Sequence, residues 1–79
     1  MTDTTASGPR PTPRYSDVVK RASQLADELG HSHVGVEHLF VAILENEHSL
    51  PAQQLGKIAD RDAIRQTLLE TMRSEAYNA

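Results

Sequence analysis

The stretch LGHSHVGVEHLFVAIL, residues 29–44, decides the fold that the sequence predicts. Gly30 is expected to close a helix, because glycine adopts the left-handed conformation at helix ends without a steric penalty. Further along, apolar residues recur at the spacing of one helical face: Val36, Leu39, Phe40, Ile43 and Leu44. We therefore expect a very hydrophobic helix from about Glu37 to Glu45, with Leu39 and Ile43 in the core and the other helices packed around it.

An amphipathic helix is predicted before this stretch. Thr12 is suited to the N-cap and Pro13 to the first helical position, where its missing N–H costs nothing. Apolar residues then follow at steps of three and four up to Gly30: Tyr15, Val18, Val19, Ala22, Leu25, Ala26 and Leu29. Residues 1–11 are rich in Thr, Ser, Gly and Pro without apolar periodicity, so they are predicted to be a disordered N-terminal arm.

A short helix is predicted after the turn at residues 46–48. Ser49 is its expected N-cap, and Pro51 is tolerated in its first turn. Gly56 is placed inside this helix, where it lowers the helix propensity by about 1 kcal/mol relative to Ala.

Asp60 is the expected N-cap of a last helix. Ile64, Leu68 and Met72 form its apolar stripe, and Leu69 is expected to lie about 100° off that stripe. Residues 75–79 are predicted to be a frayed tail. Because no segment alternates in the manner of a strand, the predicted fold class is all-α with four helices.

Length and composition exclude several classes of function. The 79 residues give room for one small domain, and the absence of Cys removes disulfides and thiolate metal sites and favours a cytoplasmic location. A net charge of −3 argues against nucleic-acid binding. No apolar run approaches the ~20 residues of a membrane-spanning helix, and the N-terminus lacks a signal-peptide core.

The run GHSHVGVEHLFVAIL, residues 30–44, resembles the GHxYxGTEHLLLxLL signature of the Clp N-terminal repeat, which stands at the front of the Clp/Hsp100 AAA+ unfoldases. The similarity extends from TPR at residues 12–14 to AIRQTLLE at residues 63–70. The resemblance implies a single four-helix repeat over residues 12–74, which is half of the usual tandem domain. No GxxxxGK phosphate-binding loop is present, so an ATPase module is not predicted.

The chain departs from the family pattern at two places. Val36 stands where the family usually has Thr, and we expect that this change removes a side-chain cap from the central helix, so that Gly35 or water must compensate. The connection at residues 58–60 is one residue shorter than usual and lacks the family's Gly.

The resemblance also implies a ligand site at the start of the central helix. In some Clp repeats the Glu of this motif helps to bind phosphoarginine on proteins marked for degradation. Carried over to this chain, the ligand-binding residues for phosphoarginine or a peptide are Glu37, Val36 and His38. The simpler interpretation is that Glu37 is a favourable acid in a first helical turn and that His38 is a packed structural residue.

Metal binding and catalysis are not predicted. His31, His33, His38 and His48, with Glu37, show only weak metal-ligand spacing, and the family motif already accounts for two of these histidines. Hydrolytic catalysis is not expected because no nucleophile elbow surrounds any Ser. The sequence therefore predicts no catalytic residue and no cofactor.

The predicted function is a non-catalytic binding module of bacterial protein quality control. It would dock substrates or adaptors, or modulate a Clp ATPase-protease. Two alternatives are a sequestering protein that captures Clp-directed small molecules or peptides, and a purely structural dimerisation unit. A homodimer is expected because the chain is small and has spare apolar positions such as Val41 and Leu69.

Overall fold

The computed structural model describes residues 8–78, and this part of the chain contains five helices and no strand. The helices are α2 (Pro13–Glu28), α3 (Val36–Glu45), α4 (Leu50–Leu55), α5 (Arg61–Met72) and α6 (Glu75–Asn78). The predicted all-α class is confirmed, and α2 to α5 are the four predicted helices. The prediction of a frayed tail at residues 75–79 is wrong for the described residues, because the chain forms α6 there. None of the described helices is long and apolar enough to cross a bilayer.

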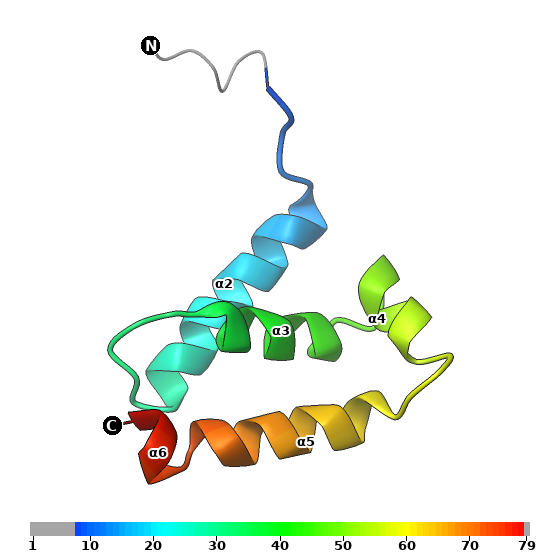
Figure 1. Cartoon of the computed structure of the whole chain (residues 1–79). Helices are drawn as coiled ribbons and strands as arrows, with labels where there is room; N and C mark the ends of the chain where they lie inside the picture. The colour runs from blue at the N-terminus through cyan, green and yellow to red at the C-terminus, as the bar shows by residue number, and fades with distance from the viewer. Residues whose placement is uncertain (1–7, 79) are drawn as a thin grey trace.

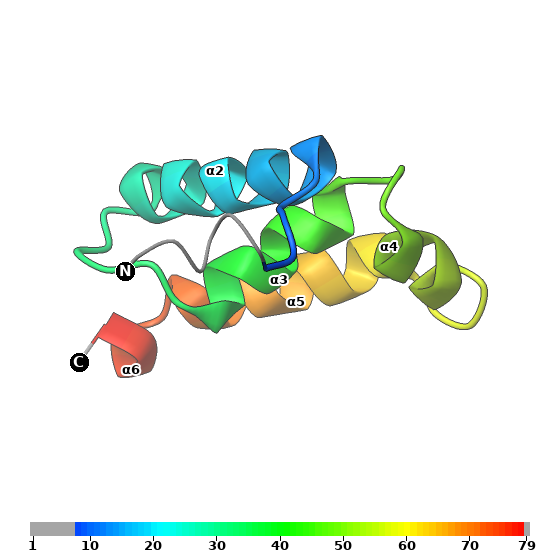
Figure 2. The same ribbon diagram turned by 90° about the horizontal axis from the view of Figure 1, so that it is seen from above.

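Helix α3 lies between α2 and α5 and packs against both (Figure 1). Figure 2 shows these three helices side by side, with α4 beyond the end of α3. Helix α6 lies near the connection between α2 and α3, so the C-terminal part of the described chain returns to the start of α3 (Figure 1). The central place of α3 follows from its sequence, since it is the helix with the most apolar surface to cover.

The core lies where α2, α3 and α5 meet. Val41 of α3 and Met72 of α5 are core residues without exposed surface. The buried cluster consists of Val18, Ala22, Leu25, Val41, Ala42, Leu69 and Met72. Small alanines on α2 and α3 allow the helix axes to approach closely, so the core is thin and aliphatic.

The buried face of α3 matches the face that the apolar spacing predicts only in part, because Leu44 is buried whereas Val36 and Phe40 are exposed. The residues of α3 that are buried are His38, Val41, Ala42 and Leu44. Leu39 and Ile43, which were expected in the core, are only partly buried and pack against it from the edge. The spacing failed because α3 is apolar on nearly all sides, so its sequence does not distinguish the side that faces two helices from the sides that face one or none.

Two residues that were expected to be spare for self-association belong to the core. Val41 has no exposed surface, and Leu69 is only 4% exposed. Of the predicted stripe of α5, Met72 is buried as expected, but Ile64 and Leu68 are less buried than Leu69. Neither Val41 nor Leu69 is available for a dimer interface, and the homodimer stays a prediction.

Three predicted helix caps are confirmed. The side-chain oxygens of Thr12, Ser49 and Asp60 accept hydrogen bonds from backbone N–H groups two or three residues further on, at 3.0 to 3.3 Å. Gly56 was placed inside the short helix, and this is wrong, because α4 ends at Leu55 and Gly56 is its C-cap. At that position Gly56 does not interrupt the helix.

A carboxylate at the end of α3 links three helices. Glu45 Oε1 accepts from Arg21 Nε of α2 at 2.8 Å, and Glu45 Oε2 accepts from Arg65 of α5 at 2.8 and 2.9 Å. Burial opposes ionisation of Glu45, but the hydrogen bonds from Arg21 and Arg65 outweigh it and lower the pKa of the carboxyl group. This cluster fixes α3 against α2 and α5 at one end.

Candidate functional site

The turn after α2 places His31 at the start of the candidate site. Gly30 has φ +75°, the only positive φ among the described residues. Its N–H donates to the carbonyl of Asp27, and the N–H of His31 donates to the carbonyl of Ala26 at 2.9 Å. This pair of bonds is a Schellman motif, which requires a left-handed residue between helix and loop. Gly30 therefore ends α2 as predicted.

A hydrogen-bonded chain through two histidines joins the start of α3 to the end of α5. The backbone N–H of Gly35 donates to His38 Nδ1 at 2.9 Å. His38 Nε2 lies 2.7 Å from His31 Nδ1, and His31 Nε2 lies 3.1 Å from the carbonyl oxygen of Met72. An amide only donates and a carbonyl only accepts, so two neutral rings satisfy the chain when each carries its proton on Nε2. All four ring nitrogens then have partners.

His38 is the most buried polar residue of this region, with no exposed surface. Burial lowers the pKa of His38 below its ordinary value, and the neighbouring rings of His31 and His33 add to the effect. The ring centroid of Tyr77 lies 5.1 Å from that of His31. The buried, neutral His38 is therefore surrounded by aromatic rings from the loop and from α6, and the simpler interpretation of a packed structural histidine fits this geometry.

Glu37 connects α3 to α6. The hydroxyl of Tyr77 donates to Glu37 Oε1 at 3.0 Å. A hydrogen bond from its own backbone N–H, and then the bond from Tyr77, hold the pKa of Glu37 below its usual range. Burial, followed by the nearby carboxylate, raises the pKa of Tyr77. Glu37 is thus an anion that already has one protein partner.

Val36 does not stand at the N-cap position of α3, where the family resemblance placed it. It is the first residue of α3 and 73% exposed, whereas the N-cap is Gly35 in an extended conformation. The expectation that Val36 removes a side-chain cap is therefore wrong, because the residue at this position is not the cap. The N–H of Gly35 is satisfied by the ring of His38 three residues further on, which is the second half of a capping box.

Val36, Glu37 and His38 are consecutive in the sequence, but their side chains differ in exposure to solvent. Val36 is exposed, Glu37 is partly buried, and His38 is covered. His48 lies in the turn after α3, away from the other three histidines. In the part of the chain that the structure describes, no group of three or more His, Asp or Glu residues is arranged to hold a metal ion.

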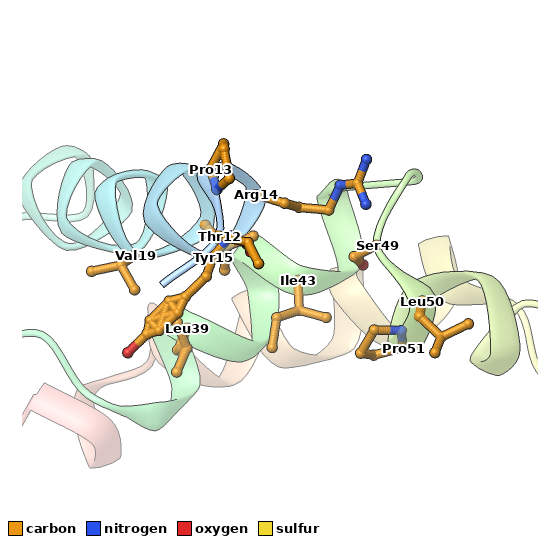
Figure 3. A pocket seen from close by; sticks show the side chains of 11 residues that line it. Thr12, Pro13, Arg14, Tyr15, Val19, Leu39, Ile43, Ser49, Leu50 and Pro51 are labelled. Carbon is orange, nitrogen blue, oxygen red and sulfur yellow. The ribbon is translucent and has the colours of Figure 1, made fainter. Parts of the chain in front are cut away.

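A groove of about 660 Å³ lies between the start of α2, the outer side of α3 and the start of α4. Figure 3 shows Leu39 and Ile43 of α3 along its floor, with Tyr15 on the α2 side and Pro51 on the α4 side. The groove is lined by Thr12, Pro13, Arg14, Tyr15, Val18, Val19, Leu39, Ile43, Ser49, Leu50 and Pro51. Tyr15, Val19 and Leu50 are 55%, 43% and 65% exposed, so apolar surface stays open there.

Sequence reasoning missed this groove. Tyr15 and Val19 were included in the apolar stripe of the first helix, as if all apolar positions of that helix faced the core. A signal was present, since α2 carries more apolar positions than one contact face accommodates. The spacing of Tyr15 and Val19, four residues apart at the start of the helix, predicts that they share a face but not what covers it.

The described residues form a small all-helical domain with an open apolar groove, and with a hydrogen-bonded histidine pair of which His38 is fully buried. The sequence model of the Clp repeat (R) N-terminal domain family matches residues 2–75. The chain belongs to this family, which confirms the resemblance. The family is one of non-catalytic N-terminal domains that are associated in general with Clp ATPase systems. No curated relative and no solved structure matches the chain.

Proposed function

We propose that the chain is a non-catalytic docking module of a cytoplasmic Clp ATPase-protease system, and that it binds a segment of a substrate, an adaptor or the ATPase itself in the groove between α2, α3 and α4. The observation that carries this proposal is the exposure of Tyr15, Val19 and Leu50 around a concave apolar surface. A small domain gains stability by burying such side chains, so leaving three of them around one groove favours a partner.

The composition of the groove supports protein binding over small-molecule chemistry. Its walls are an aromatic ring, aliphatic side chains and two prolines, with hydroxyl groups at Thr12, Tyr15 and Ser49 and one charged side chain, Arg14. Aromatic and aliphatic anchors of this kind supply most of the binding energy in protein interfaces, and a surrounding rim excludes water. The groove is open along one side, which suits a peptide segment or a helix better than an enclosed ligand.

The test is binding of the purified Clp ATPase of the source organism, with and without a bound client, to the full chain immobilised on a sensor. The double variant Tyr15→Ala/Leu50→Ala should weaken binding by more than tenfold. Ile58→Ala is the matched control, because Ile58 is 84% exposed and lies outside the groove. The proposal fails if the double variant binds as well as wild type, or if the ATPase and its clients do not bind at all.

A second candidate is recognition of phosphoarginine at the start of α3. It is supported by the exposed first residue Val36, by the anionic Glu37 and by the helix N-terminus, which attracts a phosphoryl group. His38 would then act by holding the helix start through Gly35 rather than by touching the ligand. Calorimetry with free phosphoarginine should show binding that Glu37→Ala weakens more than tenfold. No heat at millimolar ligand would exclude this candidate.

Two other roles give different results in the same assays. A sequestering protein binds its ligand tightly but does not change the ATPase rate of the Clp machine. A structural dimerisation unit self-associates without binding any Clp component. Sedimentation equilibrium at tens of micromolar, together with ATPase assays, distinguishes these roles from docking.

A further inference from the structure

The groove continues into a second hollow along α2. This second hollow has a volume of about 700 Å³ and shares Thr12, Tyr15 and Val19 with the groove. It is lined by Pro9, Arg10, Pro11, Thr12, Tyr15, Ser16, Val19, Lys20 and Ser23. The two hollows therefore form one continuous surface, with Tyr15 and Val19 at the junction. We call this combined surface the α2 face.

All the charged residues that line the α2 face are cations. They are Arg14 in the groove and Arg10 and Lys20 in the adjoining hollow. No Asp or Glu lines either hollow, although the chain as a whole carries a net charge of −3. The sign of the local charge is thus opposite to that of the whole protein.

Unlike Arg21 and Arg65, these three cations form no ion pair among the described residues. Arg21 and Arg65 are held by Glu45, and Arg21 also pairs with Glu28. Arg10, Arg14 and Lys20 are exposed, and none of them makes a salt bridge within residues 8–78.

The nearest acid in the sequence of α2 does not neutralise the α2 face. Asp17 lines a different hollow, together with Arg21, Glu45 and His48, on the side of α2 that faces the end of α3. Arg14 and Lys20 therefore lie on a different surface of α2 from Asp17.

We propose that the α2 face takes an acidic segment of a partner protein, in which Asp or Glu residues flank apolar anchors. This inference rests on the proposed docking function and names the chemistry of the partner. The apolar anchors cover Tyr15, Val19 and Leu50, and the flanking carboxylates lie near Arg10, Arg14 and Lys20. The charges are exposed, so they contribute mainly to the selection of the partner and to the rate of association, and their effect decreases with salt.

Three labelled heptapeptides test this proposal with the full chain: EELLFEE, SSLLFSS and KKLLFKK. Fluorescence anisotropy gives the affinities at low and at physiological salt, and backbone amide shifts locate the site. EELLFEE should bind at least tenfold more tightly than KKLLFKK at low salt, with shifts at residues 12–20 and 49–51. The preference should shrink at physiological salt, because screening weakens exposed charge pairs.

Charge reversal at one position makes the test specific. Arg14→Glu should weaken the binding of EELLFEE by about fivefold, which corresponds to the loss of one exposed charge pair. It should strengthen the binding of KKLLFKK. Lys57→Glu changes the net charge by the same amount, but Lys57 is exposed in the turn after α4 and lines neither hollow, so it should leave both affinities unchanged.

Each other outcome overturns the proposal. Equal binding of SSLLFSS and EELLFEE at the α2 face would remove the charge preference but leave the docking function standing. Amide shifts of the α2 face that depend on the concentration of the chain alone would identify a second copy as the occupant. If no peptide binds while the Clp ATPase still binds through Tyr15 and Leu50, the proposal of an acidic segment is wrong, but the proposed docking function stands.

Discussion

The start of α3 and the α2 face use their side chains in opposite ways. At the start of α3 the polar residues are covered and paired: His38 has no exposed surface, and both of its ring nitrogens have partners. On the α2 face the apolar residues are uncovered, and the cations are without salt bridges among the described residues. The family motif thus contributes to both regions: His38 holds the fold together, whereas Leu39 and Ile43 line the groove that we propose for binding.

The largest expected effect that separates the two regions is on stability. Met72→Ala removes a fully buried side chain next to the histidine pair and should lower the free energy of unfolding by about 2–5 kcal/mol. Leu50→Ala removes an apolar side chain of similar size that is 65% exposed. It should change the free energy of unfolding by no more than about 0.5 kcal/mol. Urea unfolding of both variants checks the difference. Equal losses would mean that the groove is part of the core.

A smaller effect is expected from His38. His38→Ala leaves the N–H of Gly35 and Nδ1 of His31 without their partner, and the loss of these two partly buried hydrogen bonds should lower the free energy of unfolding by about 1–3 kcal/mol. His48→Ala is the control, because its exposed ring makes no hydrogen bond among the described residues. If His38→Ala unfolds at the same urea concentration as His48→Ala, the histidine pair does not hold the two helices.

The same histidine predicts a pH dependence whose sign can be worked out. The pKa of His38 is lower in the folded than in the unfolded protein, so the unfolded chain binds more protons once the pH falls below about 6.5. Stability is therefore complete above that pH and decreases as the pH falls towards the folded pKa. Glu45, whose pKa is also lowered, adds a further loss below about pH 4.5. Urea unfolding at pH 8, 7, 6 and 5 should show the first loss in wild type and in His48→Gln, and a weaker one in His38→Gln. A constant free energy of unfolding in wild type would contradict the lowered pKa of His38.

The smallest expected effect concerns the attachment of α6. Tyr77→Phe removes the hydroxyl that donates to Glu37, whereas Tyr15→Phe removes a hydroxyl that makes no hydrogen bond among the described residues. The melting temperature of Tyr77→Phe should be slightly lower than that of Tyr15→Phe, and hydrogen exchange in residues 75–78 should become faster. Identical exchange in the two variants would show that α6 is held by ring packing alone.

The sequence predicted the helices and their ends well, because caps and turns are local. Thr12, Ser49, Asp60 and Gly30 act through neighbours a few residues away, and all four are where they were expected. It predicted α3 as the central helix but not which of its sides is buried, since Leu39 and Val41 are equally apolar and only the packing of α2 and α5 decides between them. Helix α6 escaped prediction because a contact 40 residues away, between Tyr77 and Glu37, holds it in place.

The candidate site divides in the same manner. Glu37 and His38 could be selected from their motif, and the structure explains how they are fixed, while their role towards a ligand stays a proposal. The groove could not be located from the sequence, because it is formed by α2, α3 and α4 together. The cations of the α2 face could not be located either. Asp17 lies between Arg14 and Lys20 in the sequence, and it faces a different surface only once the helix is formed.

The central claim is that binding takes place in the groove and not at the start of α3. The most direct test is methyl NMR of the full chain with isotope-labelled Ile, Leu and Val residues, titrated with the Clp ATPase. The account predicts that the methyl signals of Val19, Ile43 and Leu50 shift and broaden first, while those of Val34 and Val36, which are exposed near the histidines, stay in place. Perturbation of Val34 and Val36 with unchanged groove signals would contradict the account.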